Sequence, residues 1–213
     1  MTRADKTLVY LYVNGLGDGS TTLKDHLVCW WWRLSGRSIV HNHINWYDGQ
    51  GLHQKEQQVA DRVLELLKTF DGVAMIGSSA GGSLALNVFS ALKHKNICVV
   101  TAHARVRVGD YPDSNGMSLY RRARLDTNHP LQAFSDSVTV VEKSTIPSFS
   151  PADKERILSL TQLIDLVVDV SLMQITGVQT HRSLAFGHSG GFVAHLLADR
   201  DLIARFAERQ IRK

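Results

Sequence analysis

The chain is poor in the residues that mark several classes of protein. Its 213 residues include only two cysteines, Cys29 and Cys98, and four prolines. Two cysteines in apolar contexts exclude a disulfide scaffold and a four-cysteine zinc ribbon, and they favour buried thiols in a reducing compartment. No apolar run approaches the ~20 residues of a membrane span, and Met1–Lys6 lacks the apolar segment of a signal peptide. We therefore expect a cytoplasmic protein without a membrane span.

The charge of the chain is mildly basic and evenly spread. The formal net charge is +4, and the basic residues of 104–150 and 198–213 are interspersed with acids. Binding to nucleic acid needs clustered positive charge, so we expect no nucleic-acid partner. With 44% hydrophobic and 21% charged residues, the composition is typical of a folded protein, and the length fits one domain.

Short apolar segments rich in β-branched residues alternate with segments that have helical periodicity. Strands are expected at 7–13, 38–44, 73–77, 96–102, 156–160 and 180–186, and helices at 26–34, 54–70, 80–92, 170–175 and from 190 onward. This alternation predicts a parallel sheet with helices on both faces. Residues 103–150 interrupt the alternation, and all four prolines fall in or at the end of this stretch. We interpret it as a short cap inserted into a single domain that spans residues 1–213, with short helices near 117–125 and 131–142.

One glycine-rich turn has the pattern of a nucleophilic serine. The segment Gly77-Ser78-Ser79-Ala80-Gly81 fits G-x-S-x-G and lies between an apolar strand and an apolar helix. Small residues are needed at both ends because a strand that turns at once into a helix brings backbone against backbone. The turn lifts Ser79 above the sheet edge, and the helix N-terminus offers free N–H groups to a developing oxyanion. The alternative is an ordinary Gly/Ser-rich turn.

A second copy of the pattern surrounds Ser189, and the order of the later residues decides between the two. Only one expected helix follows Ser189, which leaves no strand ends for an acid and a histidine. After Ser79, by contrast, Asp165 and His188 follow the last two expected strands, at the same carboxyl edge of the sheet. We therefore predict Ser79 as nucleophile, His188 as its base, and Asp165 as the acid that orients the histidine.

Other polar residues have interpretations that need no catalysis. Asp169 fits the N-cap of a short helix, and Asp153 precedes its strand and lies at the wrong edge. A metal site is one possible interpretation of His41, His43, Asp48 and His53. We prefer the interpretation that they form the polar end of a strand near the cleft. The glycines of 15–19 lack the G-x-G-x-x-G spacing of a dinucleotide site. We expect neither a metal nor a cofactor.

The order of Ser79, Asp165 and His188 resembles the catalytic triad of the α/β-hydrolase superfamily. The resemblance covers roughly residues 7–197, without the first hairpin of the family. It implies a three-layer α/β/α sandwich with about six parallel strands and a short cap. It also implies that the loop after the first strand is the oxyanion loop, with the backbone N–H groups of Leu16 and Ala80 as the two donors.

The resemblance implies a serine hydrolase that cleaves a small or medium carboxylic ester or thioester through an acyl-enzyme. The alternative is a non-catalytic protein that binds a small molecule on the same fold, which has no need for the three residues together. The choice among ester, thioester and amide depends on the pocket that residues 103–150 build, and a homodimer is left open.

Three consecutive tryptophans, Trp30, Trp31 and Trp32, cannot all face the core from one helix, because successive residues turn by about 100°. At least one of them should lie at the surface. Contact with a partner or with lipid is the functional alternative to plain exposure.

Overall fold

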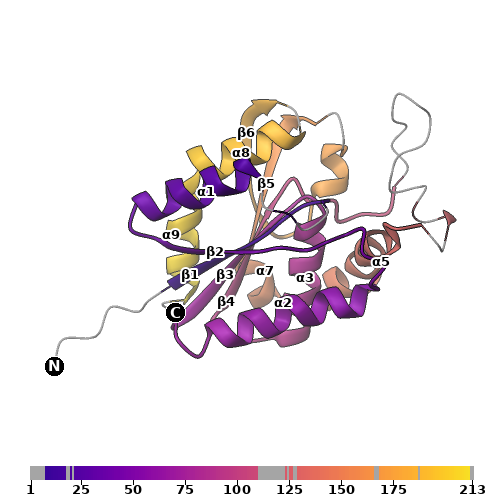
Figure 1. Cartoon of the computed structure of the whole chain (residues 1–213), viewed down its shortest axis with the longest axis horizontal. Coiled ribbons are helices and arrows are strands. Elements are labelled where there is room, and N and C mark those ends of the chain that lie inside the picture. The colour runs from indigo at the N-terminus through magenta and orange to yellow at the C-terminus, as the bar shows by residue number, and fades with distance from the viewer. Residues whose placement is uncertain are drawn as a thin grey trace.

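A six-stranded parallel sheet organises the chain (Figure 1). The computed structural model describes residues 8–17, 20, 22–109, 123, 125–126, 129–165, 168–186 and 188–211, with backbone alone for 163–164, 183–186 and 188–192. The strands are β1 (Leu8–Val13), β2 (Ser38–Asn42), β3 (Gly72–Ser78), β4 (Ile97–Ala102), β5 (Ile157–Ile164) and β6 (Gln179–Phe186). Their order is β2-β1-β3-β4-β5-β6, and every neighbouring pair is parallel. All carboxyl ends of the strands therefore meet at one edge.

Helices cover both faces of this sheet (Figure 1). One layer holds α2 (Leu52–Leu66), α3 (Ala80–Leu92) and α5 (Gln132–Val140), and the other holds α1 (Leu23–Leu34), α8 (His188–Ala198) and α9 (Arg200–Ile211). Strand β1 serves both cores, because successive side chains of a strand point to opposite faces. Leu11 packs with the α2–α3 layer, and Tyr10 packs with Trp32 and the α9 layer. The three-layer sandwich with six parallel strands is confirmed.

Some element boundaries differ from the expected ones for local reasons. Helix α1 begins at Leu23, one turn before the expected start at His26, because Thr22 and Asp25 form a capping box. Strand β5 continues past the expected end at 160 to Ile164. The single closing helix expected from residue 190 is two helices, α8 and α9, with a break at Asp199.

The second half of the expected cap packs beside α3. Helix α5, a π-helical turn (Val141–Thr145) and α6 (Ile146–Ser148) follow one another, and Phe134 and Val138 join the core that contains α2 and α3. Helix α7 (Pro151–Glu155) comes after the expected cap and leads into β5. The buried Asn87 amide of α3 donates to Ser137 O (3.3 Å) and accepts from Thr145 Oγ1 (2.7 Å), which fixes this docking. The expected helix near 117–125 lies largely outside the described residues, so a cap over the carboxyl edge stays a prediction.

Candidate active site

Ser79 occupies a sharp turn between β3 and α3. Its backbone has φ 49° and ψ −119°, a region that costs a non-glycine residue about 1–3 kcal/mol and persists only where the surroundings impose it. Its own N–H donates to Ala102 O (2.9 Å), and its carbonyl accepts from Gly82 N (3.0 Å). The side chain of Ser79 is half-buried, whereas Ser78 and Ala80 on either side are fully buried. The turn therefore places this half-buried serine at the carboxyl edge of the sheet.

The glycines of the turn are needed because backbone meets backbone there. A Cβ on Gly77 would lie 2.4 Å from Gly81 O and 2.5 Å from Gly82 Cα. A Cβ on Gly81 would lie 2.4 Å from both Val13 O and Asn14 O. No side chain fits at either position without movement of the main chain, which is the steric reason that the sequence pattern implied.

The loop after β1 lies against the turn and is hydrogen-bonded to the segment that follows β2. Asn14 accepts from Ile44 N (2.7 Å) and donates to Ile44 O (3.1 Å), and Gly17 O accepts from Trp46 N (2.9 Å). A Cβ on Gly15 would lie 3.1 Å from Ser79 Cβ, so this loop borders the candidate nucleophile directly. Leu16 packs against the core of the α2–α3 layer, and Ala80 is the first residue of α3. The assignment of their N–H groups as oxyanion donors remains a proposal.

Asp165 lies directly after β5 and is buried rather than on a surface loop. One carboxylate oxygen accepts from Val168 N (3.0 Å), and the other lies 3.4 Å from His103 Nδ1. The side chains of Asp165 and His103 are both fully excluded from solvent. A buried carboxylate needs such partners, because leaving it unpaired costs several kcal/mol.

His103 and His195 belong to this polar cluster, and the sequence analysis missed both. His103 follows β4 with φ 54°, and its N–H donates to Leu160 O (3.0 Å). The His195 ring on α8 stands 5.0 Å from the His103 ring, nearly perpendicular to it. His195 Nδ1 also contacts Asp199, and its Nε2 lies 3.1 Å from Thr161 O. Burial lowers the pKa of His195, against the opposing effect of Asp199. The rule that selected Asp165, a polar residue just after an apolar strand, would also have found His103.

His188 opens α8 directly after β6, which brings its backbone to the same edge of the sheet as Ser79 and Asp165. Its side chain, like that of Ser189, lies outside the described part of the chain. The structure thus brings the ends of β3, β5 and β6 together in the expected order, and contact between His188 and the other two residues stays a prediction.

A second polar group lies beneath the turn on the α1 side of the sheet. Tyr12 Oη is 3.3 Å from Ser78 Oγ, and its ring stacks on His41 at 4.7 Å. His41 in turn contacts His43, with 3.8 Å between ring centroids. Burial raises the pKa of Tyr12, and burial together with His43 lowers the pKa of His41 to about 4. Tyr12 and His41 are therefore neutral near neutral pH, as a packed interior requires.

The alternative of a metal site gains no support from the geometry. Asp48 forms an ion pair with the buried Lys55 (2.7 Å), and the pKa of Asp48 is lowered because this bond and one from Gln50 N outweigh partial desolvation. Among the residues that the structure describes, no three His, Cys, Asp or Glu side chains converge as a metal site would need.

Comparison with known proteins finds matches among solved structures alone. No protein-family model matches the chain, and no curated protein matches its sequence. The mature lipase BlEst2 of Bacillus licheniformis aligns with a TM-score of 0.67 at 11% identity, over 94% of this chain and 93% of that one. The chain has the α/β-hydrolase fold.

Two further structures with the α/β-hydrolase fold align over similar lengths. A lipase-esterase related protein from Clostridium acetobutylicum has a TM-score of 0.58 at 15% identity, over 96% of this chain and 95% of that one. A monoacylglycerol lipase of Paleococcus ferrophilus has a TM-score of 0.60 at 11% identity, with 96% and 94% covered. Identities this low establish the α/β-hydrolase fold, and the chemistry has to be argued from this chain's own residues.

Proposed function

We propose that the protein is a serine hydrolase that cleaves a small or medium carboxylic ester or thioester through an acyl-enzyme. The observation that carries the proposal is Ser79, a non-glycine residue held in a strained turn with its hydroxyl at the carboxyl edge. Strain of this kind is retained where it serves function. The names of the aligned structures, two lipases and a lipase-esterase related protein, support hydrolase chemistry on this fold.

In this mechanism His188 takes the proton from Ser79 Oγ while Oγ attacks the carbonyl carbon of the substrate. The oxyanion accepts hydrogen bonds from the N–H groups of Leu16 and Ala80, each contributing about 3–4 kcal/mol of transition-state stabilisation. His188 then gives the proton to the leaving alcohol or thiol, and an acyl-enzyme remains on Ser79. Water repeats the same steps, which releases the acid and restores the serine.

The supporting contacts favour a site that needs little reorganisation. The loop of Leu16 is bonded through Asn14 and Gly17 to the segment after β2, and Asp165 is fixed by Val168 N and by His103. Donors that are already in place stabilise a developing charge better than donors that must first turn toward it.

The second candidate is a non-catalytic protein that binds a small molecule on the same fold. Such a protein would require neither a strained residue at position 79 nor a buried acid after β5. A fluorophosphonate probe separates the two functions, because it reacts covalently only with an activated serine. We expect labelling of the wild-type protein, with the label on the peptide of Ser79 by mass spectrometry.

Two variants make this experiment decisive. Ser79→Ala should abolish both labelling and hydrolysis of p-nitrophenyl esters, while Ser189→Ala should be labelled like the wild type. A label on Ser189, or no label on the folded protein, would reject the proposed mechanism. A series of p-nitrophenyl esters and acyl thioesters of increasing chain length then defines the substrate class.

A further inference from the structure

Helix α1 has an apolar face on each side. Val28, Cys29 and Trp32 are buried in the core between α1 and the sheet. On the opposite side, large apolar side chains point to solvent at the spacing i, i+4, i+7, i+8 and i+11, which is one stripe of a helix. This α1 ridge consists of Leu23 (85% exposed), Leu27 (45%), Trp30 (53%), Trp31 (38%) and Leu34 (62%).

One residue of the ridge, Trp31, is held against α8 and α9. Trp31 Nε1 donates to Leu197 O (3.1 Å), and the guanidinium of Arg200 lies over the Trp31 ring at 5.2 Å. Trp32 beneath it donates to Leu196 O (2.7 Å). Trp31 and Trp32 are therefore fixed by hydrogen bonds to the backbone of α8. An apolar stripe of this size on the surface marks an interaction site.

The charges around the ridge are positive. Lys24, Arg33 and Arg37 lie on α1 or just after it, and the one acid within 22–37 is Asp25, which is buried and caps the helix. Asp201 of α9 forms an ion pair with Arg37 at 2.9 Å, so Lys24 and Arg33 carry the excess positive charge on α1.

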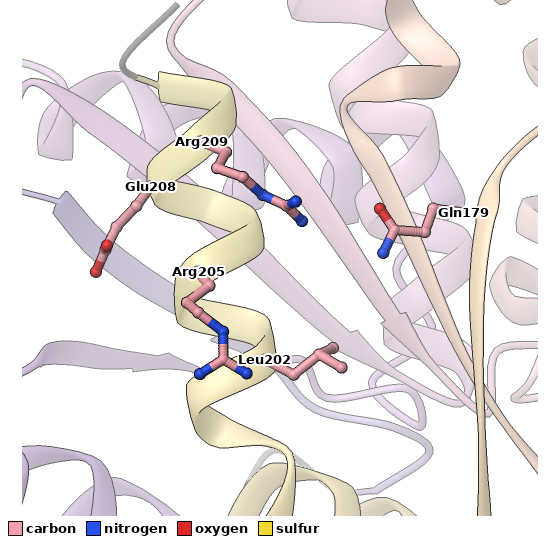
Figure 2. Close-up of a pocket in the computed structure, with 5 residues that line it drawn as sticks. All are labelled: Gln179, Leu202, Arg205, Glu208 and Arg209. Atoms are coloured by element: carbon pink, nitrogen blue, oxygen red, sulfur yellow. The ribbon is translucent and has the colours of Figure 1, made fainter.

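A basic pocket lies further along the same layer, between α9 and the beginning of β6. Figure 2 shows Arg209 and Gln179 extending toward each other across the gap, while Glu208 points away on the other side of α9. The cavity has a volume of about 340 Å³. It is lined by Gln179, Leu202, Arg205, Glu208 and Arg209. Within the described chain, Arg205 and Arg209 form no ion pair, and both are exposed.

The ridge and the pocket belong to one face of the molecule. Helices α1, α8 and α9 cover the same side of the sheet (Figure 1), and Arg200 at the start of α9 donates to Trp31 O (3.3 Å). With a rise of 1.5 Å per residue, Arg205 and Arg209 lie about 8 and 14 Å further along α9. The ridge is on the side of α1 that faces away from the sheet, and Arg205 and Arg209 are exposed on α9, with Arg209 extending toward Gln179 at the edge strand β6.

A second copy of the chain that docks on the α1 ridge alone would bury too little surface for a stable dimer. A helix of 12 residues is about 18 Å long and 10 Å wide, which gives roughly 200 Å² of contact against the ~800 Å² per partner of a stable interface. Symmetric pairing would also bring Lys24 and Arg33 of two copies toward each other. A surface of tryptophan and leucine bordered by lysine and arginine instead matches the interface of an anionic bilayer.

We propose that this face binds the surface of a bilayer that contains anionic phospholipid. The α1 ridge enters the interfacial region, and Arg205 and Arg209 bind lipid phosphate groups. None of the described helices is long and apolar enough to cross a membrane. The binding proposed here is peripheral, and it does not depend on the catalytic proposal.

Co-sedimentation of the full chain with vesicles tests the proposal. We expect binding to an equal mixture of phosphatidylcholine and phosphatidylserine, little binding to phosphatidylcholine alone, and release by salt because salt screens exposed charges. Tryptophan emission should shift to shorter wavelength on binding. Trp30 and Trp31 would carry the shift, since Trp32 and Trp46 are already fully buried.

Matched variants separate this surface from general stickiness. Leu27→Ser combined with Trp30→Ser should weaken vesicle binding at least about tenfold, because interfacial affinity scales with the apolar area that enters the bilayer. Leu64→Ser is the control, since Leu64 is similarly exposed (44%) on α2 in the other layer. Arg205→Glu with Arg209→Glu should also weaken binding, while Lys68→Glu should not. Thermal melting verifies that each variant is folded.

Several outcomes would overturn the proposal. One is no binding to the anionic vesicles, and another is equal binding to both lipid compositions. Equal losses in the ridge variant and the Leu64 control would also reject it. Finally, a dimer in analytical ultracentrifugation that Trp30→Ser dissociates would assign the ridge to self-association instead.

Discussion

The substitution Gly81→Ala tests whether backbone contact at the turn positions the nucleophile. The new Cβ would lie 2.4 Å from Val13 O and Asn14 O, whereas ordinary contact begins at 3.4 Å. Both oxygens belong to the main chain, so no side chain can swing aside. The start of α3 and the loop after β1 must therefore separate by about 1 Å, and overpacking of this kind costs about 1–3 kcal/mol of folding free energy.

This separation would displace Ser79 and Ala80 from the loop that carries Leu16. Because a misplacement of 1 Å can cost about 100-fold in rate, we expect kcat/KM for a p-nitrophenyl ester to fall by about 100-fold. Thermal melting should show a smaller effect, a decrease of about 2–4 °C for each kcal/mol in a chain of this size. The variant should therefore be folded and nearly inactive.

Gly17→Ala is the matched control in the neighbouring loop. The nearest atom to its Cβ would be Asn14 Nδ2 at 3.8 Å, which is ordinary contact, so activity and stability should change little. A folded Gly81→Ala protein with wild-type kcat/KM would refute the reasoning. The close approach of Gly81 to β1 would then not be what positions Ser79.

Three further predictions concern the acid, pH and metal. Asp165→Asn should lower kcat for esters about 10⁴-fold, because the histidine would then be held in the wrong tautomer; near-normal kcat would reject Asp165 as the triad acid. The pKa of His41 is lowered from 6.5 to about 4. Between these two pH values the unfolded chain binds a proton that the folded chain does not bind, so the free energy of unfolding decreases as the pH is lowered from 6.5 to about 4. After allowance for solvent screening we expect a loss of about 1–2 kcal/mol in urea titrations, and His41→Gln should flatten this dependence if the assignment is correct. Esterase activity should survive EDTA, and its loss with recovery on Zn²⁺ would revive a metal site at His41 and His43.

The sequence predicted the sheet well because each strand is a short apolar run. Where it erred, polar residues were the cause. Strand β5 was expected to end at 160, yet Thr161 and Gln162 continue it and are fully buried. A polar residue that tertiary neighbours bury cannot be distinguished from a loop residue by the hydrophobic pattern of the sequence alone. The start of α1 is a different case. The capping box of Thr22 and Asp25 can be recognised in the sequence, but the prediction did not use it.

The candidate site divides in the same way. The turn at Ser79 and the position of Asp165 could be predicted because the sequence itself shows the G-x-S-x-G pattern and the ends of the strands. The contacts of His103 with Asp165 and of His195 with His103 join β4, β5 and α8. Such contacts depend on which strands are neighbours, and only the observed order β3-β4-β5-β6 supplies that.

This strand order also sets a condition on the proposed triad. Neighbouring strands lie about 4.8 Å apart, so the end of β6 is roughly 14 Å from the end of β3. No imidazole spans that distance, so the proposed triad requires the backbone of His188, at the start of α8, to lie over the ends of β4 and β5 and not directly above β6. His103 and Asp165 occupy those two ends and are both buried. In the proposed triad, His188 would pack on these two residues, and His103 would hold the Asp165 carboxylate in place through its contact with it. The triad thus needs four adjacent strand ends, and β3 to β6 are adjacent in this sheet.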